Sequence, residues 1–305
     1  MSVAVDFANY RGELAALATA FCWTASALAF TAAAKRLGSL VLNLVRLAIA
    51  LGFMTLYGWL VRGLPLPTDA TAHNWLWLGL SGLVGFTFGD LCLFRAFVLI
   101  GPRVTMLLMA LVPMIAAIVS WAALGEALPW TAGVGMALTI GGVAWVVLEQ
   151  RPPHPELPHT VSATGILLAL GAAAGQAVGL VLSKVGMAGY DPFASTHIRT
   201  ITGLGGFAAI FLVTGAWPRL AAGLKSGAGM GYASIGALFG PFIGVSLSLV
   251  AITYTWVGVA ATIMSIVPVL IIPFMMVIYR ERVSTRAVLG ALAAVAGVAV
   301  LFLWR

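Results

Sequence analysis

Charged residues are scarce in this chain. They make up only 8% of its 305 residues, whereas soluble globular chains carry about 25%. Hydrophobic residues make up 62%, and the mean hydropathy is +1.07. A water-soluble domain of this size has no use for so much apolar sequence. The composition therefore excludes a soluble globular protein and indicates one embedded in a membrane.

Other scarce features exclude further classes. The only two cysteines, Cys22 and Cys92, both lie within apolar segments and do not indicate a redox compartment. The sequence has no Walker A motif, no zinc motif and no serine nucleophile elbow, so we expect neither a metal nor a cofactor. The net charge of +7 sits mainly in short loops and forms no basic stripe, so a nucleic-acid partner is not expected.

Long apolar runs recur along the chain. Each is near the roughly 20 residues that a helix needs to cross a bilayer. Helices are expected because a transmembrane barrel would need alternating strands of about ten residues. The ten predicted spans are 12–34, 40–61, 75–98, 103–124, 130–149, 161–184, 194–215, 231–254, 258–279 and 286–304.

The second half of the chain repeats the first. Two offsets, 155 residues for most positions and 153 for the first two spans, bring like residues opposite one another. The matched pairs include Ser81, Gly85 and Gly89 with Gly236, Gly240 and Gly244; Pro113 with Pro268; Glu126 with Glu281; Gly135 and Gly142 with Gly290 and Gly297; and Arg46 with Arg199. The Ser81 and Gly236 rows each have a spacing of four, which places them on one helix face, where we expect close packing.

The repeats define the predicted domains. Residues 1–150 form the first unit, 151–160 a proline- and histidine-rich linker, and 161–305 the second unit. Because each unit has five spans, an odd number, the second enters the membrane from the opposite side. The predicted fold is therefore an all-α polytopic membrane protein with ten transmembrane helices, in two inverted five-helix repeats around a central cavity. This architecture is typical of secondary transporters.

Basic residues suggest the orientation. The loops after the odd-numbered spans hold nine Lys and Arg residues, and the opposite side holds four. Because cytoplasmic loops are enriched in Lys and Arg, this bias places both termini on the outer side.

One spacing occurs twice and indicates a family. Pro113, Glu126 and Gly135 recur as Pro268, Glu281 and Gly290, with the short turns LGEAL and YRERV and a glycine-rich last span in each unit. In these features the chain resembles the EamA family of the drug/metabolite transporter superfamily, of the two-repeat ten-span type. The resemblance implies a multi-pass carrier of the bacterial inner membrane that moves small metabolites, often amino acids or their relatives, usually as export. Many relatives have cytoplasmic termini, contrary to the charge bias.

Asp90 is the sharpest candidate for a site. It lies in the middle of the third span, and its counterpart in the other repeat is Val245. Phe86 and Phe94, four residues to either side, would share its helix face, whereas Arg95 would not. A carboxylate at that depth must pair, become protonated or bind something. Two readings stay open: an ion pair with an arginine of another helix, or a contact with a substrate amine or a coupled proton.

Other polar residues complete the candidate binding set. Trp23, Ser26 and Gln176 lie in the first span of each repeat, which the resemblance implies lines the cavity. His197 differs between the repeats, since its counterpart is Leu44, and a binding residue need not be repeated. Ordinary helix packing is the alternative for these residues.

Two repeated residue pairs have other expected roles. Arg46 and Arg199 could extend to the membrane interface, pair as scaffold or gate charges, or bind a substrate carboxylate. We assign them as gate or structural charges. Pro113 and Pro268 lie within spans and should bend their helices, either as hinges or to shape the cavity.

These patterns together favour a secondary transporter that exports an amino acid or a related metabolite by alternating access. The alternative is a broad-specificity exporter of drugs or organic cations. An intramembrane enzyme is disfavoured because the Phe88–Gly89–Asp90 sequence has no second mid-span aspartate to form an acid pair. A channel is disfavoured because there is no filter-like run. The expected partners are the substrate, the lipid bilayer and protons, with a monomer as the expected state.

Overall fold

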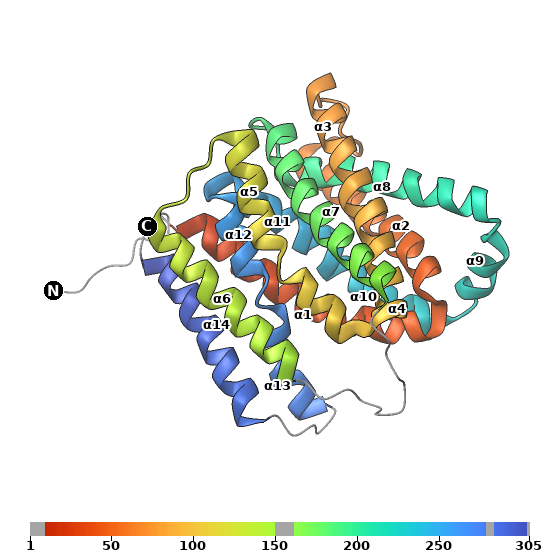
Figure 1. Ribbon diagram of the computed structural model, residues 1–305. Helices are drawn as coiled ribbons and strands as arrows, with labels where there is room; N and C mark the ends of the chain where they lie inside the picture. The colour runs from red at the N-terminus through yellow and green to blue at the C-terminus, as the bar shows by residue number, and fades with distance from the viewer. Residues whose placement is uncertain (1–9, 150–161, 279–283, 304–305) are drawn as a thin grey trace.

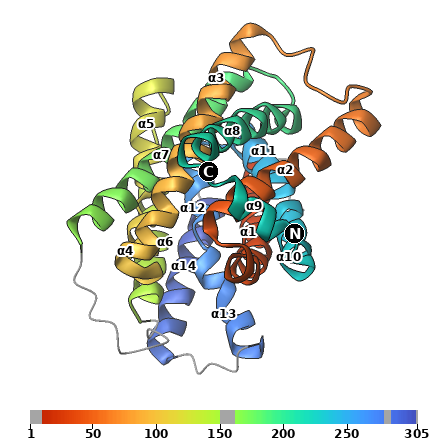
Figure 2. The same cartoon turned by 90° about the vertical axis from the view of Figure 1, so that its right-hand side faces the viewer.

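The computed structural model describes residues 10–149, 162–278 and 284–303, which form helices and no strand (Figures 1 and 2). The helices of the first half are α1 (Arg11–Leu37), α2 (Ser39–Tyr57), η2 (Gly58–Arg62), α3 (Ala72–Gly82), η3 (Leu83–Gly89), α4 (Asp90–Met109), α5 (Val112–Leu124) and α6 (Trp130–Glu149). The second half contains α7 (Ala163–Met187), α8 (Pro192–Thr214), α9 (Trp217–Leu224), α10 (Gly227–Ala237), η4 (Leu238–Gly244), α11 (Val245–Tyr254), α12 (Val257–Met264), α13 (Val267–Ile278) and α14 (Thr285–Leu303). The segments labelled η are π-helices.

Nine helical stretches of the described residues are long and apolar enough to cross a membrane. They are Arg11–Leu37, Ser39–Arg62, Ala72–Ala96, Thr105–Leu124, Trp130–Glu149, Ala163–Met187, Pro192–Thr214, Gly227–Tyr254 and Val257–Phe274. A shorter apolar helix, Thr285–Leu301, occupies the position of the tenth predicted span. The protein is therefore an all-helical, multi-pass membrane protein.

Local sequence explains where several helices start and end. Thr71 and Asn74 form a capping box at the start of α3, in which Thr71 Oγ1 accepts from Asn74 N and Asn74 Oδ1 accepts from Thr71 N. Asp191 caps α8 by accepting from Ala194 N at 2.8 Å. Gly125, with φ at 68°, ends α5 in the left-handed conformation that glycine adopts most easily.

Both halves contain a π-helical segment at the same place. η3 and η4 begin at Leu83 and Leu238 and end at Gly89 and Gly244, and both pairs match at the offset of 155 residues. A π-turn holds more residues than an α-turn and often occurs at functional sites. Phe86 lies inside η3 and Asp90 directly follows it, so the stretch between them is π-helical and not regular α-helix.

The fourth predicted span of each half is also interrupted at a matched position. α4 gives way to α5 at Ala110 and Leu111, and α12 gives way to α13 at Ser265 and Ile266. Pro113 and Pro268 each lie in the first turn that follows, where the missing proline N–H costs no helical hydrogen bond. The two prolines thus restart a helix after a break. A role as hinges stays a prediction.

Small residues bring the halves into contact. α6 and α14 run side by side (Figure 1), and a Cβ added at Gly297 would lie 2.8 Å from Gly135 O. A Cβ added at Gly290 would lie 3.1 Å from Gly142 O. Residue numbers rise along one helix as they fall along the other, so these two helices are antiparallel. Spacing this close requires residues without large side chains.

The same arrangement recurs around α1 and α7. A Cβ added at Gly179 of α7 would lie 3.1 Å from Gly85 Cα in η3. One added at Gly236 of α10 would lie 2.3 Å from the Phe30 ring of α1. The core of the molecule therefore sits between the two halves, where the first span of each half meets the third span of the other.

Candidate functional site

A buried ion pair joins helices of the first half at the centre of the molecule. Asp90, at the start of α4, pairs with Arg46 of α2, and their side chains are 8% and 13% exposed. Gln176 of α7 donates from Nε2 to Asp90 Oδ1 at 3.1 Å and to Gly85 O at 3.3 Å. Residues from three predicted spans and both halves thus meet at one carboxylate. The sequence left two roles open for Asp90, an ion pair with an arginine of another helix or a contact with a substrate amine or a proton. The observed geometry matches the ion pair.

A second arginine lies beside this pair. Arg199 of α8 is only 4% exposed, so it does not extend to the membrane interface. Its guanidinium carbon lies 4.9 Å from the ring centroid of Phe86. Its charge acts on Asp90, although the two residues form no ion pair. The repeated arginines, Arg46 and Arg199, therefore converge on one unrepeated carboxylate.

Trp23 and Ser26 face the glycine row of the other half. Ser26 Oγ donates to Gly236 O at 3.1 Å, and a Cβ added at Gly244 would lie 2.7 Å from Trp23 Cδ1. Ser26 is buried and Trp23 is half-buried. Both residues thus contribute to packing between α1 and the third span of the second half, and their role in binding stays a prediction.

His197 contacts a different part of α2 from the one that carries Arg46. His197 Nε2 lies 3.4 Å from Thr55 Oγ1, which follows Arg46 by more than two turns of α2. Phe94 is half-buried on α4. The structure therefore groups Asp90, Arg46, Arg199, Phe86 and Gln176, and places His197 between α2 and α8, nearer one end of the bundle.

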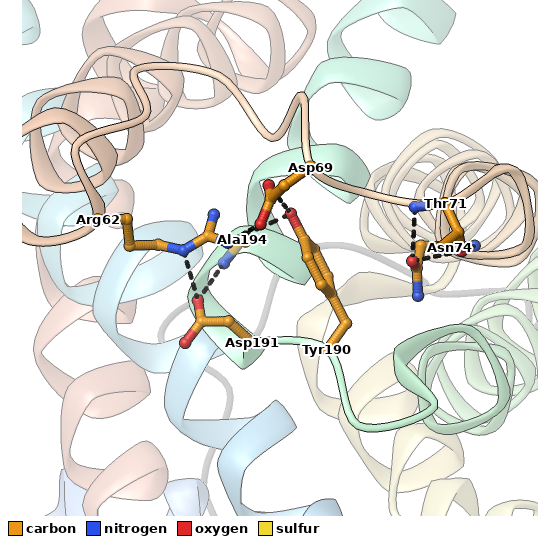
Figure 3. A network of polar contacts seen from close by, with 7 residues as sticks. All are labelled: Arg62, Asp69, Thr71, Asn74, Tyr190, Asp191 and Ala194. Atoms are coloured by element: carbon orange, nitrogen blue, oxygen red, sulfur yellow. Dashed lines mark hydrogen bonds and ion pairs between the residues drawn. The ribbon is translucent and has the colours of Figure 1, made fainter.

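One end of the bundle holds a polar network that the sequence did not reveal (Figure 3). Arg62 pairs with Asp69 at 2.5 Å and approaches Asp191 at 4.0 Å. Tyr190 donates from its hydroxyl to Asp69 Oδ1 at 2.6 Å. The network joins the α2–α3 connection of the first half to the α7–α8 turn of the second. We call this end of the bundle the Arg62 face.

A pocket of about 450 Å³ adjoins this network. The pocket is lined by Asp69, Thr71, His73, Asn74, Ala188, Gly189 and Tyr190. The central cavity expected from the sequence stays a prediction.

Glu126 ties three further elements together at the Arg62 face. Its carboxylate accepts from Lys184 Nζ at 2.5 Å and from Val257 N at 2.9 Å, at the start of α12. Lys184 also donates to Thr255 O at 3.0 Å. Glu126 thus pairs with a basic residue of the other half and accepts a hydrogen bond from the first turn of α12. Its repeat counterpart, Glu281, lies outside the described residues.

The Tyr190–Asp69 hydrogen bond has a predicted pH signature. The bond, together with Arg62, holds the pKa of Asp69 below its usual range, and burial and the bond raise the pKa of Tyr190 to about 12. The carboxylate therefore contributes stability that is present above about pH 4 and lost as the pH falls further. The phenol contributes stability that is present below about pH 10 and lost as the pH rises to about 12.

We expect Tyr190→Phe to remove the alkaline loss and to weaken the acid loss. Thermal unfolding midpoints measured across this pH range test it, with Tyr232→Phe on α10 as the matched control. Superimposable profiles for the wild type and Tyr190→Phe would show that the bond does not contribute to stability.

Comparison with known proteins agrees with the sequence pattern and the fold. The model of the EamA-like transporter family matches residues 10–148 and again residues 163–303. A solved structure titled only "Crystal structure of protein" has a TM-score of 0.72 and 21% identity, over 95% of each chain, which shows a shared fold. No curated protein matches. Because the family model covers nearly the whole chain in two copies, the protein belongs to the EamA-like transporter family.

Proposed function

We propose that this protein is a secondary transporter that moves a small metabolite across the membrane by alternating access. The observation that carries the proposal is the buried charge cluster of Asp90, Arg46, Arg199 and Gln176. Ionisable groups inside membrane spans are expensive and mark substrate or ion pathways. This cluster draws on both halves, and in transporters of this architecture the substrate lies at the interface of the two repeats near the midplane.

We further propose ten spans in two inverted repeats, residues 1–150 and 161–305. The antiparallel contacts of α6 with α14 support this topology, because helices equivalent under an inverted repeat must run in opposite directions. The matched π-helices and the matched breaks before Pro113 and Pro268 support the equivalence of the halves. The linker would then lie on the side opposite both termini.

The proposed substrate is an amino acid or a related compound, and the proposed direction is export from a bacterial cell across its inner membrane. Asp90 is the proposed coupling or amine-binding carboxylate, held by Arg46 until substrate or a proton arrives. The other proposed contacts are Trp23, Ser26, Phe86, Phe94, Gln176 and His197, with Arg199 treated below and Pro113 and Pro268 as hinges.

Counterflow in proteoliposomes tests the function. Vesicles loaded with one unlabelled compound from a panel of amino acids and metabolites should accumulate the labelled compound, with and without a pH gradient. A carrier gives saturable counterflow. Single-channel currents without counterflow would indicate a pore, and absence of flux for every compound would contradict the proposal.

Cysteine labelling tests the topology. In a background with Cys22→Ala and Cys92→Ala, single cysteines replace Thr68, in the α2–α3 connection, and Ala228, at the start of α10; both positions are exposed. We expect a membrane-impermeant maleimide to label the two from opposite sides, with Thr68 on the outer side as the charge bias predicts. Labelling of both from one side would contradict ten inverted spans, and labelling of Thr68 from the cytoplasm would reverse the orientation only.

A further inference from the structure

The central cluster contains more positive than negative charge. Arg46 and Arg199 face one carboxylate, Asp90, and Gln176 is neutral. Arg46 pairs with Asp90. Arg199 forms no hydrogen bond or ion pair through its side chain with the residues that the structure describes, and its Nε is buried without a partner. One buried guanidinium is thus left without a direct counter-charge.

Such a charge is unfavourable inside a membrane protein. A buried ion needs a paired opposite charge and hydrogen-bond acceptors for its N–H groups. The Phe86 ring face attracts the cation but accepts no hydrogen bond of ordinary strength. Asp90 acts on Arg199 only from a distance and already accepts from Arg46 and Gln176. Arg199 therefore lacks an anion that fits beside it.

Other unpaired polar atoms lie on the same two helices. Among the described residues, α2 and α8, which pack together, carry four buried side-chain atoms without a partner: Asn43 Oδ1, Arg46 Nε, Ser195 Oγ and Arg199 Nε. Ser195 and Arg199 are four residues apart on α8, and Asn43 and Arg46 are three apart on α2, so each pair shares a helix face. Donors thus predominate among these atoms, as an anion would require.

The backbone leaves room for the guanidinium. A Cβ added at Gly85 would lie only 3.2 Å from Arg199 Nη2, so the glycine of η3 lets this group approach the helix. Bidentate binding by the planar guanidinium is the geometry that suits a carboxylate. A single uncompensated positive charge matches one carboxylate, whereas a phosphate group would bring close to two negative charges.

We propose that Arg199 is the receptor for the carboxylate of the transported substrate. The proposal rests on the proposed function and narrows it: the substrate carries a carboxylate, as a zwitterion or an anion, and organic cations without one are excluded. Ser195 Oγ and Arg46 Nε are the other buried donors of these two helices that have no partner. The protein without substrate then carries an unpaired buried charge that the substrate neutralises.

The experiment compares compounds that differ only at the carboxylate. Counterflow and thermal-shift binding are measured in wild type for L-leucine, L-leucinamide and isoamylamine, and for the corresponding sets built on alanine, phenylalanine and lysine. Carboxylate-bearing members should be carried and should raise the melting temperature, whereas the amides and amines should do neither. Arg199→Met and Arg199→Lys are tested beside Arg95→Gln, an exposed arginine on α4.

We expect Arg199→Met to weaken binding of the carboxylate at least tenfold, Arg199→Lys to retain part of it, and Arg95→Gln to behave as wild type. Without substrate, Arg199→Met should melt no lower than wild type, since it removes an unpaired charge. An unchanged KM in Arg199→Met, a lower melting temperature without substrate, or equal transport of amines would overturn the proposal while leaving a transporter. A wild type that carries and binds no compound would overturn both this proposal and the proposed function.

Discussion

Replacing Asp90 by asparagine is expected to abolish transport and to lower the free energy of unfolding by about 3–5 kcal/mol. The substitution keeps the shape of the side chain and removes its charge. Arg46 then becomes a second buried arginine without an ionised partner, next to Arg199. Breaking a buried pair on one side is costly because the remaining charge stays desolvated.

A double variant separates stability from transport. Arg46→Gln with Asp90→Asn replaces the ion pair by two neutral amides, and we expect it to recover most of the lost stability but no transport. Unfolding is followed by denaturant titration in detergent, and transport by counterflow. Asp69→Asn, a carboxylate at the Arg62 face, is the control for a charge outside the cluster. If Asp90→Asn transports normally with unchanged pH dependence, Asp90 neither couples protons nor holds substrate.

Gly142→Ala is expected to destabilise the α6–α14 pair by about 1–3 kcal/mol. The new Cβ would lie 2.4 Å from Ala294 N and 2.6 Å from Gly290 O. Both are backbone atoms of a packed helix, so neither can turn aside as a flexible side chain would. The two helices would have to separate along their whole length of contact.

The neighbouring glycine is a matched control. A Cβ added at Gly141 meets no atom within 4 Å. Gly141→Ala should therefore be neutral or raise helix stability by up to about 1 kcal/mol, because alanine favours helix over glycine. Melting temperatures of the two variants, measured in the same detergent, decide the matter. An equal fall in melting temperature for Gly142→Ala and Gly141→Ala would show that Gly142 does not act through the close contact between the two helices.

The sequence predicted the elements of this fold better than their contacts. Apolar runs and internal offsets are local or periodic signals, so the spans and the repeated units could be found from them. The π-segments could not, because a one-residue change in helical pitch leaves hydropathy unaltered. The break before Pro113 was signalled by the proline itself.

The candidate site was only partly predictable. Asp90 was identified by its position in the middle of a predicted span. Arg46 and Arg199 were identified because they occupy matching positions in the two repeats. Arg46 and Asp90 are 44 residues apart in the sequence, and tertiary packing brings them together. No local sequence signal indicates which of the two arginines forms the pair. The Arg62 network was missed because Asp69 and Tyr190 lie in connections, where no periodicity marks a contact.

The exchange of partners between the halves also constrains how the protein is made. Thr19 of α1 contacts Gly244 O, 225 residues further along the chain. At about 5–20 residues per second, a ribosome needs roughly 10–45 s to supply that partner. During this interval the face of α1 that packs against η4 in the finished protein has no partner from the second half. Biogenesis must therefore keep α1 in place until the last third of the chain has been inserted, and a first half made alone would lack the surfaces on which its helices settle.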